Sequence, residues 1–238
     1  MENQKKSNTK LIILIIAIVI IVIAIVAIFA FSFFNTVKQR ATLFDEINTI
    51  NETSKVDMTI KTTGEYAKVE KALKEHLKEY YDALDKATES YQNSGLDNML
   101  SADNIAANGP EFTEQKDKLN SLISLGNEVK ETLSRVSTEE YEKQKATEAG
   151  LEGKYMDLYT EIVSLGENAT KNIGVIDANN AYLDKLLQIL NFLTSNKDNW
   201  KVNGEYIEFS TDELVNTYNT LLSEAKDAAA KITEATNK

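Results

Sequence analysis

The stretch LIILIIAIVIIVIAIVAIFAFSFF, residues 11–34, is an unbroken apolar run that decides how the rest of the chain is organised. Ser32 is its only polar side chain, and no residue in it is charged. At about 1.5 Å of rise per residue, a helix over these 24 residues is roughly 36 Å long, enough to cross a hydrocarbon core of about 30 Å with some tilt. The sequence therefore predicts a transmembrane helix over residues 11–34, with the lipid bilayer as its partner.

A cleaved signal peptide is the alternative interpretation, because Ala30-Phe31-Ser32 offers small residues at the spacing of a cleavage site. The apolar region of a signal peptide is only about 7 to 15 residues long, which favours a retained anchor here. Three lysines precede the run within residues 1–10, a tail too short to fold. Because basic flanks are retained inside, we expect this tail in the cytoplasm and residues 35–238 outside it, at the cell membrane.

The composition of the predicted extracytoplasmic region argues against several classes of partner and several kinds of site. Residues 35–238 carry 23 Lys and Arg against 36 Asp and Glu, and this acidity argues against nucleic acid and anionic lipid surfaces as partners. The chain has no cysteine, which excludes disulfides, thiolate metal sites and a cysteine nucleophile. Its only histidine, His76, lies beside an apolar helical stripe and is interpreted as structural.

Apolar residues recur at helical spacing almost throughout the region after the run. The helix of the run is expected to continue unbroken to about residue 50, and residues 51–63 predict a polar link. A second helix opens near Gly64 and ends near Gly95. Its apolar stripe, which must pack on other helices, comprises Tyr66, Val69, Leu73, Leu77, Tyr80, Leu84, Ala87 and Tyr91.

Four further helices are expected, and several local signals place their ends. Pro110 suits the first position of the third helix. Two capping boxes, beginning at Ser137 and Ser210, predict the starts of the fourth and sixth. The glycines at 150 and 153 predict a bend in the fourth helix, and a break is expected near residues 172–174.

The clearest β signal is WKVNGEYIEF, residues 200–209. Asn203-Gly204 suits a two-residue type I′ turn, which would pair Val202 with Glu205 and Trp200 with Ile207. Trp200, Val202, Ile207 and Phe209 would then share one face. Because a lone hairpin is marginally stable in water, we expect this face to pack on the end of the helices.

The predicted fold class is therefore all-α. An N-terminal transmembrane helix continues into an elongated antiparallel helical bundle that carries one small β-hairpin at about residues 199–209. One-sided stripes and short connections favour antiparallel neighbours, and residues 35–238 are expected to form one domain.

No motif for catalysis or cofactor binding occurs, so we expect no catalytic, cofactor-binding or metal site and a protein that is not an enzyme. The many carboxylates lie on helix faces opposite the stripes and are interpreted as solvated. Three tyrosines lie off the stripes and are the interface candidates, since tyrosine is a common interface anchor: Tyr81, Tyr159 and Tyr206.

The helix start Thr63-Gly64-Glu65-Tyr66 and the hairpin that leads into a capped helix resemble those of uncharacterised single-pass, membrane-anchored helical proteins of Gram-positive bacteria. That resemblance covers the layout and implies no activity. The predicted function is a membrane-tethered extracytoplasmic module that binds a protein or a cell-envelope component. Two alternatives stay open: a ligand-binding or sensory bundle, and a membrane-active, pore-forming-like helical protein.

Overall fold

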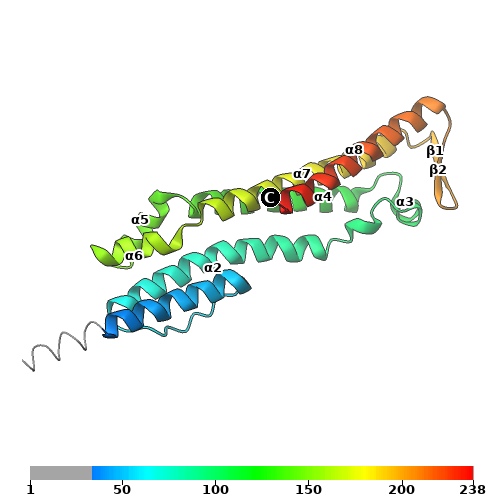
Figure 1. The fold of residues 1–238 in the computed structure, drawn as a ribbon. Coiled ribbons are helices and arrows are strands. Elements are labelled where there is room, and N and C mark those ends of the chain that lie inside the picture. The colour runs from blue at the N-terminus through cyan, green and yellow to red at the C-terminus, as the bar shows by residue number, and fades with distance from the viewer. Residues whose placement is uncertain (1–33, 238) are drawn as a thin grey trace, which may run out of the picture.

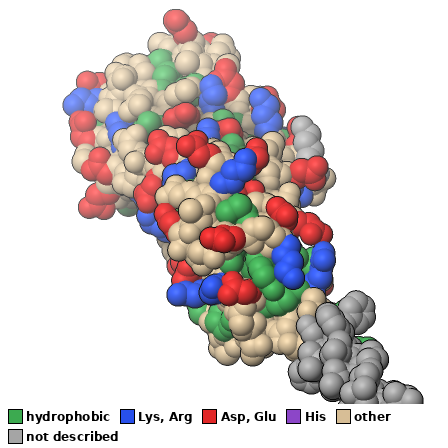
Figure 2. Space-filling view, turned by 90° about the vertical axis from the view of Figure 1, so that its left-hand side faces the viewer, with side chains coloured by type: hydrophobic (Ala, Val, Ile, Leu, Met, Phe, Trp, Pro, Cys, Tyr) green, Lys and Arg blue, Asp and Glu red, His purple; other side chains and the backbone are tan. Residues whose placement is uncertain are grey.

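The computed structural model describes residues 34–237, which form an elongated, mostly helical body (Figure 1). The predicted tail 1–10 lies outside the described residues, and so does all of the apolar run except Phe34. Among the helices of residues 34–237, none combines the length and apolar character that a membrane crossing requires. Viewed from the end where the described chain begins, acidic and basic side chains are interspersed over the surface (Figure 2).

The described chain begins in a helix over residues 34–53, called here the first helix. A link over residues 54–64 leads from it to the second helix. The sequence predicts this link at residues 51–63, so the first helix ends about three residues later than predicted. The remaining elements are α2 (Glu65–Gln92), the short 3₁₀ helix η1 (Leu96–Asn98), α3 (Ala102–Asn108), α4 (Thr113–Val136), α5 (Glu139–Glu148), α6 (Lys154–Val163), α7 (Gly166–Ser195), β1 (Trp200–Asn203), β2 (Tyr206–Phe209) and α8 (Asp212–Thr236).

The long helices run up and down the length of the body (Figure 1). From the end where the described chain begins, α2 runs to the far end and α4 returns, while α5 and α6 remain near the first end. α7 then runs out again, and α8 returns along it after the hairpin. The predicted mostly helical bundle with one small antiparallel hairpin is confirmed.

The interior is divided into two apolar cores. One lies between the first helix, α2, α5, α6 and the adjoining parts of α4 and α7. The other lies between α3, α8, the hairpin and the remaining parts of α4 and α7. A polar layer lies where the buried Asn180 donates to Asn127 at 3.1 Å and accepts from Tyr91 at 3.5 Å.

The predicted fourth helix is divided into α5, α6 and the first turn of α7: its glycines end α5 instead of bending it, and residues 164–165 separate α6 from α7. Gly150 has φ of 66°, and the N–H groups of Gly150 and Leu151 donate to Thr147 and Ala146 at 2.9 Å each. This is the Schellman arrangement that closes a helix with a left-handed glycine. The predicted break at residues 172–174 is wrong: α7 runs through Gly174, since one interior glycine costs only about 1 kcal/mol.

Both predicted capping serines are off by one residue. Thr138 accepts from the N–H of Tyr141, and Thr211 accepts from that of Leu214. Ser137 is instead occupied in closing α4, where its hydroxyl donates to Leu133 O at 2.7 Å. The third helix also begins later than Pro110, at Thr113, so the local signals placed the helix starts only to within a few residues.

The hairpin has the predicted face but not the predicted register. Trp200 pairs with Phe209 and Val202 with Ile207, and the turn is Gly204-Glu205 with positive φ at Gly204 alone. The observed register places apolar residues directly opposite each other and Lys201 opposite Glu208, at 3.0 Å. It differs from the prediction by two residues, which preserves the face because side chains alternate with period two.

The polar layer leads to a paired prediction about glycines. A Cβ at Gly126 of α4 would lie 2.4 Å from Asn180 Oδ1, whereas one at Gly174 of α7 would meet nothing within 4 Å. We expect Gly126→Ala to lower the free energy of unfolding by about 1–3 kcal/mol through overpacking. Gly174→Ala serves as the control and is expected to raise it by about 0.5–1 kcal/mol.

Urea denaturation of the full chain in detergent measures both changes. Equal effects of the two substitutions would contradict a tightly packed layer at Asn180.

Candidate functional site

The first helix is joined to α2 by a cluster that we call the ionic clasp: Glu46, Lys61, Thr62, Glu70 and Lys74. Thr62, Glu70 and Lys74 are buried, Glu46 is partly buried and Lys61 is exposed. At its centre, the Lys74 side chain is fully buried. Its ammonium donates to Thr59 O at 2.6 Å and Glu46 Oε2 at 3.0 Å, and pairs with Glu70 Oε1 at 2.8 Å. All three protons of the ammonium therefore have partners.

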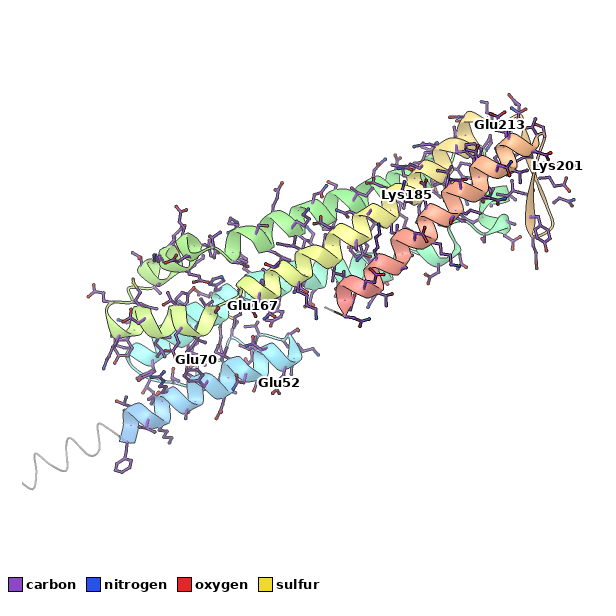
Figure 3. The ribbon with its side chains drawn as sticks, turned by 45° about the horizontal axis from the view of Figure 1, so that its top comes forward. Glu52, Glu70, Glu167, Lys185, Lys201 and Glu213 are labelled. Atoms are coloured by element: carbon purple, nitrogen blue, oxygen red, sulfur yellow. The ribbon has the colours of Figure 1, made fainter. Side chains whose placement is uncertain are left out.

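Glu70 is buried as completely as Lys74 and is held by the link as well as by α2. Its carboxylate accepts from the backbone N–H groups of Lys61 and Thr62, and from the Thr62 hydroxyl at 2.7 Å. Figure 3 labels Glu70 at the end of the body where the first helix and α2 lie side by side. The clasp thus binds the first helix, the link and α2 together.

Electrostatics keeps Glu70 and Lys74 charged. Burial alone would raise the pKa of Glu70, but the hydrogen bonds from Lys74 and Thr62 outweigh it and lower that pKa. Burial likewise opposes the hydrogen bonds from Glu70 and Glu46 to Lys74, whose pKa is nonetheless raised. Both shifts favour the charged forms, so Glu70 and Lys74 form a buried ion pair.

Apolar burial beside the clasp supplies most of the affinity between the first helix and the body. Leu43, Ile47 and Ile50 are each at most 3% exposed, and burying such a side chain contributes about 1.5–3 kcal/mol. A buried ion pair is by contrast close to neutral relative to apolar residues of the same volume. The clasp therefore fixes the register of the first helix more than it adds net stability.

His76 lies at the other side of α2, enclosed by α4, α5 and α6. Its Nε2–H donates to Val136 O at 2.6 Å, and its Nδ1 lies 2.6 Å from the Tyr159 hydroxyl. Because a carbonyl only accepts, Nε2 carries the proton, and in the neutral ring Nδ1 accepts from Tyr159. The ring also meets that of Tyr141 edge to face at 5.1 Å.

The environment of His76 favours the neutral ring. Burial lowers the pKa of His76, and this outweighs the hydrogen bond to Val136 and the nearby Glu79 carboxylate, which act to raise it. Lys145 on α5 and Arg135 on α4 lower the pKa further. With both nitrogens occupied and no access to solvent, His76 acts as a structural residue, in agreement with the interpretation of the sequence.

Only one of the three tyrosines proposed as interface anchors is exposed. The expectation of surface positions is wrong for Tyr81, which is 9% exposed, and for Tyr159, which is 0% exposed. Tyr81 packs against Tyr80 and donates to Asn51 of the first helix at 3.2 Å, while Tyr159 contacts His76. Each lies off its helix's main stripe because the helix packs on partners at more than one face.

Tyr206 is 75% exposed and lies on a supported hairpin at the far end of the body. Trp200 of the same hairpin donates from its ring N–H to Leu193 O at 2.7 Å and stacks on Phe112 at 6.1 Å. On β2, Phe209 packs against Tyr218 at 5.1 Å. These contacts hold the hairpin to α7 and α8 and leave Tyr206 directed outward from a fixed position.

A groove of about 780 Å³ lies between the start of α7 and the end of α8. Small residues such as Gly166, Gly174 and Ala178 line its floor, with Glu167 and Lys231 among its polar residues. The groove is open to solvent and does not enclose a ligand. Within residues 34–237, no group of three or more His, Asp or Glu side chains is arranged to hold a metal ion.

The sequence model of a family described as "Protein of unknown function (DUF3053)" matches residues 61–238. The chain belongs to the DUF3053 family. The DUF3053 match includes α2 to α8 and the Glu70 and Lys74 members of the clasp, and it begins after the first helix. Comparison with curated proteins and with solved structures gave no match.

Sequence reasoning missed the clasp altogether. Glu70 and Lys74 are four residues apart on α2, a spacing typical of exposed ion pairs. The only available signal was their position, each one residue after a member of the apolar stripe.

Removing the buried cation of the clasp is expected to be costly. In Lys74→Met the buried Glu70 loses its ion-pair partner, while the partly buried Glu46 keeps its pair with Lys61, and we expect the free energy of unfolding to fall by about 3–5 kcal/mol. Lys71→Met on the same helix is the control, because its pair with Glu75 is exposed and contributes about 0–1 kcal/mol. Urea denaturation measures both variants, and similar losses would show that the clasp is not a buried ionic unit.

The buried neutral His76 predicts a loss of stability in mild acid. Its folded pKa lies below the unfolded value of about 6.5, so the unfolded chain binds the proton more strongly. The stabilisation is therefore complete above about pH 6.5 and is lost as the pH falls through that value toward the folded pKa.

We expect His76→Gln to flatten this part of the profile of unfolding free energy against pH. Glu70, whose pKa is lowered from 4.5, contributes its own loss only below about pH 4.5 and is common to both proteins. An equal slope for the wild type and the variant between neutrality and about pH 4.5 would contradict the assignment.

Proposed function

We propose that the chain is a membrane-tethered helical module that binds a protein or a cell-envelope component outside the cytoplasm and performs no catalysis. The observation that carries the proposal is the junction after the apolar run. Residue 34 already lies in the first helix. This helix is bound to the body by the clasp and by buried apolar residues such as Leu43. A membrane anchor over residues 11–34 would thus connect to the body without a flexible linker.

The far end of the body is the best candidate for the binding surface. Tyr206 is the most exposed large hydrophobic residue of the described chain, and a supported hairpin holds it away from the helices. Exposed tyrosines on rigid supports make good interface anchors, because little side-chain entropy is lost on binding. The proposed orientation places this surface opposite the membrane, where a soluble or envelope-bound partner reaches it.

The non-catalytic part of the proposal rests on the state of the titratable groups. His76 is enclosed with both nitrogens engaged, and the most buried carboxylate, Glu70, is held by Lys74 and by the link. Catalytic acids and bases need access to substrate and a pKa tuned toward the working pH. The two groups have the pattern expected of structural elements.

Photo-crosslinking in intact cells tests the binding surface. A benzoylphenylalanine at position 206 is expected to give one discrete adduct in the membrane fraction. The same group at Lys226, exposed on α8 away from the hairpin, is expected to give none. Equal labelling at the two positions, or no adduct at 206, would count against the hairpin as the binding surface.

Position 206 also tests on which side of the membrane the body lies, because the natural chain has no cysteine and a single introduced thiol can be labelled alone. Tyr206→Cys should react with a membrane-impermeant maleimide in intact cells, whereas Ser7→Cys in the predicted tail should react only after lysis. The reverse labelling pattern would contradict the proposed orientation.

A further inference from the structure

The end of the body where the described chain begins has a defined edge. Gln39 of the first helix donates to the Thr63 hydroxyl at 3.0 Å and accepts from the Thr63 N–H at 2.9 Å. Thr63 directly precedes Gly64, the N-cap of α2, so this pair marks where the body begins. Residues 34–38 extend beyond it by about one helical turn.

Apolar side chains are exposed on that extra turn. Phe34 is 70% and Val37 is 51% exposed, although both are large and apolar. Figure 2, viewed from this end, shows hydrophobic side chains gathered beside the grey residues that precede position 34, with Lys, Arg, Asp and Glu around them. Apolar exposure of this kind marks a surface that meets a partner or a membrane.

Two aromatic residues of other helices, each partly buried against the core, lie at the same end. Tyr66 in the first turn of α2 and Tyr155 in the first turn of α6 meet edge to face at 5.4 Å, and Lys154 lies over the Tyr155 ring at 5.0 Å. Tyrosines and lysines are enriched where membrane proteins meet the lipid headgroups, because their apolar bodies and polar tips suit that layer. Figure 1 shows the start of α6 at this end.

The charges at this end are compatible with a neutral lipid surface. Arg40 pairs with Glu161 at 3.3 Å, and Lys68 pairs with Glu65 at 2.8 Å. These paired charges give no basic patch, and the exposed Lys38 and Lys154 alone fall short of the cluster of about four to eight Lys and Arg that anionic lipids attract. This end is therefore suited to contact a lipid surface through aromatic and apolar side chains and not through attraction between charges.

Under the proposed tether, this end lies at the membrane surface. As a helix, the apolar run would exceed a hydrocarbon core of about 30 Å, which would put Phe34, its last residue, at or just beyond the core boundary. The headgroup layer adds roughly 5–7 Å on each side. Gln39 lies five residues further along the helix, about 7.5 Å, which is the outer edge of that layer.

We propose that this end face, made by Phe34, Val37, Tyr66 and Tyr155 and called here the membrane seat, lies on the lipid headgroups and holds the body upright. The inference rests on the membrane tether of the proposed function and adds a second contact with the bilayer. The clasp fixes the first helix to α2, so the seat and the helix together set the angle of the whole body. The hairpin then stands at the opposite end of the body, beyond the roughly 45 Å that the 30-residue α7 alone spans.

Two single-cysteine variants test the seat, and the absence of natural cysteine makes each label unique. Lys154→Cys lies beside the seat and Glu205→Cys at the hairpin tip, and both positions are exposed. The full chain, labelled with an environment-sensitive fluorophore, is reconstituted in phosphatidylcholine vesicles with or without a headgroup spin label. We expect the spin label to quench the fluorophore at 154 several-fold and to leave the one at 205 unchanged.

Each outcome bears on one proposal. Equal quenching at both positions means that the body lies on its side, and no quenching at either means that it stands clear of the lipid; both overturn the seat. Failure of the full chain to float with the vesicles instead overturns the tether itself. Urea denaturation of both labelled variants confirms that they are folded, and Lys68→Cys replaces Lys154→Cys if the latter is not.

Discussion

The burial of Lys74 between Glu46 and Glu70 is the constraint on which the arrangement of this molecule depends. Glu46 belongs to the first helix, Glu70 belongs to α2, and the intervening link supplies Thr59 O as a third acceptor. An unpaired buried charge costs several kcal/mol, so the three segments have to meet in one register. Apolar burial holds the first helix against α2, and the clasp determines where along α2 it lies.

The rest of the body is long because it stacks two modest cores end to end within one set of helices. α4 and α7 pass through both cores, and the layer around Asn180 divides them. The amide nitrogen and oxygen of Asn180 each have a hydrogen-bond partner, so burying this residue costs little free energy. The layer also fixes how α4 lies against α7. The two ends of the body are consequently free to differ in chemistry.

The functional proposal rests on this difference between the two ends of the body. The end near position 34 carries exposed apolar and aromatic residues beside the apolar run, and the opposite end carries a supported hairpin with Tyr206 outermost. A rigid rod with unlike ends suits a protein that must hold a binding surface at a fixed distance from a membrane. The DUF3053 match includes the hairpin end and the body, and so places the proposed binding surface within the family region.

The sequence by itself determined the helical class, the start of α2, the shared face of the hairpin and the structural role of His76. These follow from periodicities of 3.6 and two residues and from local turn chemistry, which are properties of short segments. Only the tertiary structure decided that Tyr81 and Tyr159 are buried, that Glu70 and Lys74 form an interior ion pair, and that the strands pair two residues away from the predicted register. The reason is physical: a single stripe reveals one packed face, whereas α2 is covered on several sides by helices that come from distant parts of the chain.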